Sequence, residues 1–113
     1  MLKEETAKQE PVKQGEEDTL VVELSQTYEF EGKKIKEMDL RKLRDATAND
    51  MIKASRALAL MGENSSGEET TLGYACALAG TVTDLPMEFY RTLKAPDALK
   101  LKNRVVGFLY GII

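Results

Sequence analysis

The chain has 113 residues, of which 42% are hydrophobic and 31% are charged, with a net charge of -3 and no histidine. The lack of histidine removes the commonest general base and the commonest metal ligand. The single cysteine, Cys76, excludes an internal disulfide and a zinc site built from several thiolates. We therefore expect a small binding protein and not an enzyme, with no metal and no cofactor.

Two further features bear on where the protein works. No stretch approaches the ~20 apolar residues of a membrane-spanning helix, and the first residues are charged where a signal peptide would be apolar. We expect a protein of the reducing cytoplasm, without membrane contact.

Residues 1–18 form a polar segment with almost no large apolar side chains. They contain three lysines and six carboxylates, and removing them from the 16 basic and 19 acidic residues of the chain leaves 13 of each sign. Such a segment cannot bury enough surface to offset its ordering entropy, so we predict a disordered tail. We expect residues 19–113 to form a single domain. Its balanced charge argues against a nucleic-acid-binding module, which is normally strongly basic.

The first predicted element is a β-hairpin over residues 20–38. A β-favouring run begins at Leu20, and Glu31-Gly32 is suited to a two-residue turn. With that turn, Phe30 faces Lys33, Glu29 faces Lys34 and Tyr28 faces Ile35. This register places opposite charges across one face and two apolar residues across the other, which are favourable cross-strand pairs.

The hydrophobic period then changes to that of helices. A short helical segment over about 39–45 could begin at Asp39. Thr47 and Asp50 resemble a capping box that opens a helix over 48–61, before Gly62. At helical spacing, its apolar face is predicted to consist of Met51, Ile52, Ser55, Leu58 and Ala59.

Three more helices are predicted, over about 68–82, 86–93 and 96–110. The first would begin after Ser66 or Gly67, with Glu68 and Glu69 in its first turn. From Thr71 to Val82 it is small and apolar nearly all round, which is typical of a buried central helix. The expected fold is α+β and mainly α, with a small N-terminal β-hairpin followed by a four- to five-helix bundle.

The last helix carries more apolar surface than a terminal helix needs. Leu101, Val105, Phe108 and Ile112 form one face, and an apolar flank lies beside it. Both faces could pack into the core. The alternative is that part of this helix contacts a partner or another copy of the chain. The candidate partner-binding residues are Leu99, Val105, Val106, Phe108, Leu109 and Tyr110.

Other candidate sites have simpler explanations. Cys76 lies between Ala75 and Ala77 with no base nearby, so we interpret it as a core thiol. The carboxylates that could form an acid–base pair fall at turns and helix starts, where capping explains them. One segment has a local excess of basic residues, with Asp97 as its only acidic residue. This excess leaves open a nucleic-acid-binding regulatory module. The basic residues are Arg91, Lys94, Lys100, Lys102 and Arg104.

The sequence resembles the tail assembly chaperones of long-tailed phages and prophages. The resemblance rests on Tyr28-Glu29-Phe30-Glu31-Gly32-Lys33, Leu40-Arg41-Lys42-Leu43, Thr47-Ala48-Asn49-Asp50-Met51-Ile52 leading to Leu58, Leu85-Pro86, and Val105-Val106-Gly107-Phe108-Leu109. It covers about residues 19 to 110 and excludes the polar tail.

The resemblance implies a non-catalytic role in the cytoplasm of the host cell. Family members coat the tape-measure protein, a long, largely helical and aggregation-prone chain, until tail-tube subunits replace them. A longer form made by ribosomal frameshifting recruits the tube subunits. A structural tail or head-completion component of the virion would share the same size and lack of catalytic groups, and so stays an alternative.

Overall fold

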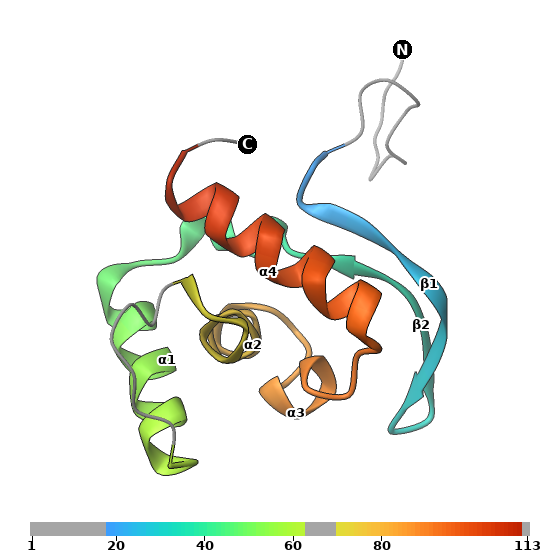
Figure 1. The fold of residues 1–113 in the computed structure, drawn as a ribbon, viewed down its shortest axis with the longest axis horizontal. Helices are drawn as coiled ribbons and strands as arrows, with labels where there is room; N and C mark the ends of the chain where they lie inside the picture. Colours follow the sequence, from blue (N-terminus) through green and yellow to red (C-terminus); the bar gives the residue numbers. More distant parts are fainter. Residues whose placement is uncertain (1–17, 63–69, 112–113) are drawn as a thin grey trace.

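The computed structural model describes residues 18–62 and 70–111 and is drawn in Figure 1. Its elements, in chain order, are β1 (Val21–Phe30), β2 (Lys33–Asp39), the 3-10 helix η1 (Arg41–Asp45), α1 (Ala48–Leu60), α2 (Leu72–Val82), α3 (Met87–Tyr90) and α4 (Ala95–Leu109). The expected N-terminal hairpin and mainly helical remainder are confirmed. Within the described residues, α3 is a single helical turn, so the long helices are α1, α2 and α4.

Helix α2 is the central element. It is seen nearly end-on in the middle of Figure 1, and it contacts α1, α3, α4 and η1. All six residues from Tyr74 to Ala79 are buried, as the small and apolar sequence predicts. Gly80 allows the chain after the helix to return closely, because a β-carbon at this position would lie 2.6 Å from the α-carbon of Met87.

The hairpin has the predicted register. Phe30 pairs with Lys33, Glu29 with Lys34 and Tyr28 with Ile35. Glu31 and Gly32 both have positive φ, 51° and 82°, as a type I′ turn requires. The hairpin curves along one side of the helices in Figure 1.

Aromatic contacts join the hairpin to α3. The ring of Phe89 is fully buried and meets Tyr28 and Phe30 edge-on, with ring centroids 6.0 Å and 5.5 Å apart. Edge-to-face packing is a preferred geometry for aromatic pairs. The short helix α3 therefore packs against the hairpin on one side and against α2 on the other.

Two predicted helices are shorter than expected. The segment predicted over 39–45 is a 3-10 helix that begins at Arg41, because Asp39 ends β2 and accepts a hydrogen bond of 3.1 Å from the backbone N–H of Arg41. The helix predicted over 86–93 ends at Tyr90, since the next residues form a turn in which the N–H of Thr92 bonds back to Phe89.

Helix α1 has the predicted capping box. The Thr47 hydroxyl accepts from the N–H of Asp50, and the Asp50 carboxylate accepts from the N–H of Thr47. Its buried face is rotated from the predicted one: Ala54 and Leu58 are buried, whereas Ile52 is 53% exposed and Ala59 is exposed too. The prediction was wrong here because α1 packs mainly against α2, which covers only a narrow stripe of it.

The start of α2 also differs from the prediction. The helix begins at Leu72 and is capped by Thr71, whose side chain accepts from the N–H of Tyr74 at 3.1 Å. The predicted start at Ser66 or Gly67, with Glu68 and Glu69, lies outside the described residues.

The predicted tail 1–18 falls outside the described residues except for Asp18. Its carboxylate accepts two hydrogen bonds from the Arg44 guanidinium, at 2.8 Å and 2.7 Å, and one of 2.9 Å from the N–H of Leu20. Asp18 thus contacts the folded part of the chain through Arg44 and Leu20.

Candidate partner-binding surface

Within the described residues there is no cluster of three or more histidine, cysteine or acidic side chains that could bind a metal ion. Cys76 is buried in α2, as predicted for a core thiol. Asp39 pairs with Arg41 and Asp84 pairs with Lys42. None of the helices in the described ranges has the length and apolar character that a bilayer crossing requires.

Helix α4 is anchored to β1 through the buried carboxylate of Asp97. This side chain is 0% exposed and accepts three hydrogen bonds: 2.9 Å from the Ser25 N–H, 2.8 Å from the Ser25 hydroxyl and 2.7 Å from the Tyr28 hydroxyl. The Tyr28 oxygen in turn accepts from the N–H of Lys94, just before α4. With three donors, the buried Asp97 carboxylate has the hydrogen-bond partners that its burial requires.

An irregularity in β1 makes this anchor possible. The pairing shifts between Glu23 and Tyr28, which face Glu37 and Ile35 respectively. Four residues of β1 therefore lie opposite a single residue of β2, and the extra length directs Ser25 to the first turn of α4. The positive end of a helix dipole also favours a carboxylate there.

The protonation states of the anchor follow from its contacts. Desolvation raises the pKa of Asp97, but hydrogen bonds from Tyr28 and Ser25 outweigh it, so the pKa lies below its usual value. Desolvation and the neighbouring Asp97 carboxylate raise the pKa of Tyr28. At neutral pH Asp97 is ionised and Tyr28 is protonated, so α4 is held by charge-assisted hydrogen bonds.

The outward side of α4 carries apolar residues beside the exposed Asn103. Leu101 and Val105 are fully buried on its inner side, whereas Leu99 is 53% exposed and Tyr110 is 54% exposed. Val106 is half-buried and follows Leu99 by seven residues, which places it on the same outward face. We call Leu99, Val106 and Tyr110 the α4 stripe. A solvated helix normally carries polar residues here, so the stripe is a candidate docking surface.

The structure divides the six predicted partner-binding residues. Leu99, Val106 and Tyr110 make up the α4 stripe. Phe108 and Leu109 are half-buried and pack against the core. Val105 is a core residue with 0% exposure, so its side chain is not presented to a partner in this fold.

The charged side chains of α4 that reach the surface are all positive, and each is half-buried. Its lysine and arginine residues are Lys100, Lys102 and Arg104, and its one carboxylate, Asp97, is buried. Lys100 donates to the Glu23 carbonyl at 3.1 Å, and Arg104 donates to the Thr19 carbonyl at 2.9 Å. Two of the five cations in the predicted basic segment therefore also donate hydrogen bonds to the backbone of β1 and of the residues just before it.

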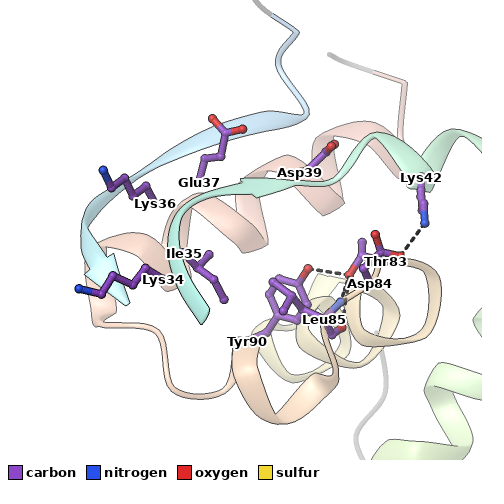
Figure 2. Close-up of a pocket in the computed structure, with 10 residues that line it drawn as sticks. All are labelled: Lys34, Ile35, Lys36, Glu37, Asp39, Lys42, Thr83, Asp84, Leu85 and Tyr90. Carbon is purple, nitrogen blue, oxygen red and sulfur yellow. Dashed lines mark hydrogen bonds and ion pairs between the residues drawn. The ribbon is translucent and has the colours of Figure 1, made fainter. Parts of the chain in front are cut away.

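A pocket of about 330 Å³ lies between β2 and the segment that follows α2. Figure 2 shows its lining, with Lys34, Ile35 and Lys36 on one side and Leu85 and Tyr90 on the other. Burial raises the pKa of Tyr90 to about 12, and its hydroxyl lies 2.7 Å from that of Thr83. Tyr90 is thus protonated at neutral pH and already hydrogen-bonded. The pocket joins residues more than 40 positions apart, which explains why the sequence did not indicate it.

A second group of exposed apolar residues belongs to α1 and the start of α2. Ile52, Leu60 and Met61 belong to α1 and its C-terminal cap, and Leu72 begins α2; their exposures are 53%, 88%, 46% and 37%.

A comparison with models of protein families gives a match over most of the chain. The family model described as "Phage tail assembly chaperone proteins, E, or 41 or 14" matches residues 21–110. The match runs from the first residue of β1 to the cap of α4. No curated protein and no solved structure matches the chain.

Proposed function

The chain belongs to the phage tail assembly chaperone family, and from this membership we propose that it binds the tape-measure protein and keeps it soluble during tail assembly. The role needs no catalysis, only a surface that shields an aggregation-prone partner. The proposed place of action is the cytoplasm of the host cell.

The observation that carries this proposal is the α4 stripe. A long helical partner exposes apolar stripes of its own before it is assembled, and helix-on-helix contact buries such stripes. Leu99 and Tyr110 are 53% and 54% exposed on a helix whose inner side is firmly packed. The stripe can therefore contact a partner while α4 keeps its place in the fold.

A test compares two matched double variants. Leu99→Lys with Tyr110→Lys alters the α4 stripe, and Ile52→Lys with Met61→Lys alters apolar residues of similar exposure on and beside α1. Each chain is co-expressed with the tape-measure protein of the same phage, and the soluble fraction and co-purification of that protein are measured.

The expected result is that the wild-type chain and the α1 variant keep the tape-measure protein soluble and the α4 variant does not. Loss of two central apolar contacts should weaken binding by roughly 10- to 100-fold, with an unchanged circular dichroism spectrum. If the wild-type chain itself neither binds nor solubilises the tape-measure protein, the proposed function is wrong.

Two other partners stay proposals from the same family membership. A longer form could recruit tail-tube subunits, and copies of the chain could associate with each other. Neither is favoured by a particular contact among the described residues. The nucleic-acid-binding alternative has lost part of its basis, because Lys100 and Arg104 also bond to carbonyls of the hairpin segment.

A further inference from the structure

We propose that two copies of the chain pair with each other through the outer edge of β2, antiparallel and around a two-fold axis. We call the side of Lys33–Asp39 that is turned away from β1 the β2 edge. The inference gives a surface to the self-association named above as a possible partner. It does not involve the α4 stripe, so it goes beyond the proposed function and can fail separately from it.

The two outer edges of the hairpin differ in their hydrogen bonds. On β1, the N–H of Ser25 donates to the Asp97 carboxylate at 2.9 Å, and the carbonyl of Glu23 accepts from Lys100 at 3.1 Å. On β2, within the described ranges, the backbone of Lys33–Asp39 is bonded to no element other than β1. An open edge of this kind presents N–H and C=O groups with which another strand can pair.

Open space lies beside the β2 edge. The pocket of about 330 Å³ is lined by residues of β2 and, across from them, by Leu85 and Tyr90. In Figure 2, Ile35 points toward these two side chains, whereas Lys34 and Lys36 point away from them. Because neighbouring strands lie only about 5 Å apart, a strand added to β2 would lie next to the mouth of this pocket.

The order of charges along β2 identifies the added strand as a second β2. The first half of the strand carries only lysines and the second half only acids, in the sequence KKIKEMD. When two copies run antiparallel about the midpoint between Lys36 and Glu37, Lys36 faces Glu37 of the other copy. In the same register Lys34 faces Asp39 of the other copy. Opposite charges across strands are favourable, and the two-fold axis forms each pair twice.

The exposure of the side chains is symmetric about the same midpoint. Met38 is fully buried and Ile35 packs against the core, although they are three residues apart. The alternation of a regular strand therefore slips between them, where the pairing with β1 is irregular, and Lys36 and Glu37 are both exposed. In the proposed register, Ile35 faces Met38 of the other copy on the inward side and the charges face each other on the outward side.

The charges within one chain also favour a second copy. Glu37 lies opposite Glu23 in the hairpin, and like charges at opposed positions are destabilising. A lysine from another copy beside Glu37 offsets this repulsion. Lysines on an edge strand commonly keep other strands away, but here the acids of a second copy lie opposite them. The β2 edge therefore excludes most strands and accepts its own sequence.

The experiment exchanges the two central charges. Sedimentation and light scattering of the full chain are measured up to about 1 mM, and the wild-type chain should form a dimer. Lys36→Glu or Glu37→Lys alone places like charges at both central pairs and should raise the dimer dissociation constant roughly 10-fold. An equimolar mixture of the two variants should form a mixed dimer at least as tight as wild type, because each central pair then joins a glutamate to a lysine. Added salt should weaken this mixed dimer by screening.

Two control variants assign the effect to the β2 edge. Lys53→Glu, at an exposed position of α1, changes the net charge as Lys36→Glu does and should leave the dimer as in wild type. Leu99→Lys with Tyr110→Lys alters the α4 stripe and should also leave it unchanged. Circular dichroism checks that every variant keeps the fold of the wild-type chain.

The inference is overturned if the wild-type chain stays monomeric up to about 1 mM or if its dimer is unchanged in both central variants. A mixture that dimerises no better than either variant alone also overturns it, as does a dimer that the α4 variant dissociates. Loss of the dimer in Lys36→Glu with the tape-measure protein still soluble leaves the proposed function intact. A preserved dimer with failure of the co-expression test contradicts only the proposed function.

Discussion

Asp97 has the most consequential single side chain in the described part of the chain. Its carboxylate is fully buried, and it joins α4 to Ser25 and Tyr28, which lie 72 and 69 positions earlier. A buried charge is tolerated only when donors compensate for the lost water. Here the donors come from the irregular part of β1, so the strand irregularity and the carboxylate depend on each other.

Replacing Asp97 with asparagine should destabilise the fold by roughly 2 to 3 kcal/mol at pH 7, because an amide cannot accept from all three donors and brings an N–H₂ group toward them. Urea denaturation followed by circular dichroism measures the change. Asp45→Asn, at an exposed carboxylate at the end of η1, is the control and should change stability little.

The same variant should alter the dependence of stability on pH. The folded pKa of Asp97 is lowered, so its contribution is fully present above the unfolded pKa of about 3.9 and is lost as pH falls through the lower folded pKa. The stability difference between wild type and Asp97→Asn should therefore be constant near neutral pH and shrink below about pH 4. A difference that stays constant down to the acid-unfolded state would show that the Asp97 carboxylate is not stabilised by these contacts.

At the scale of elements, α2 organises the packing because its neighbours approach it very closely. Gly80 faces the backbone of Met87 at the start of α3, with no room for a β-carbon. This contact fixes where the chain turns after α2 and thereby places Phe89 against the hairpin. The positions of the hairpin, α3 and α2 thus all depend on the small size of Gly80.

Gly80→Ala should destabilise the protein by roughly 1 to 3 kcal/mol through overpacking, although alanine favours helices by ~1 kcal/mol over glycine. Thermal unfolding measures the net effect. Asn103→Ala, at an exposed position of α4, also raises helix propensity and should be neutral or slightly stabilising. A Gly80→Ala variant as stable as wild type would mean that α2 and α3 are not packed as closely as described.

For the whole molecule, family membership and the exposed α4 stripe together favour a transient shielding role. A chaperone leaves its partner before the particle is complete, whereas a structural tail or head-completion component stays in it. The presence or absence of the chain in finished particles therefore distinguishes the two functions. Its size and helical content do not.

Purified virions should therefore contain almost none of this chain. Mass spectrometry of particles, compared with lysates of infected cells taken before assembly ends, measures its abundance relative to the tail-tube subunit. Peptides of this chain at the stoichiometry of a tail or head component would rule out the chaperone role and favour the structural alternative.

Much of the fold could be predicted from the sequence because it depends on neighbours along the chain. The Glu31-Gly32 turn determines which residues face each other in the hairpin, and Thr47 with Asp50 marks the start of α1. The composition of Tyr74 to Ala79 indicates a buried helix whatever surrounds it. Leu99, Val106 and Tyr110 could be predicted as partner-binding residues from the sequence. The reason is that the last helix has more apolar side chains than one buried face can hold.

Other features were decided only by the tertiary structure. The period of a helix identifies a face but not its rotation toward the neighbours, so Ile52 proved exposed and Val105 buried. Asp97, which the sequence marks only as the one acid within a basic segment, is bound by partners about 70 positions away, and no local pattern brings these residues together. By itself the sequence determined most of the elements, the hairpin register and the surplus of apolar residues in the last helix. The packing of α4 against β1 and α2 decided which of those residues face outward, because burial is a property of what lies opposite a side chain in space.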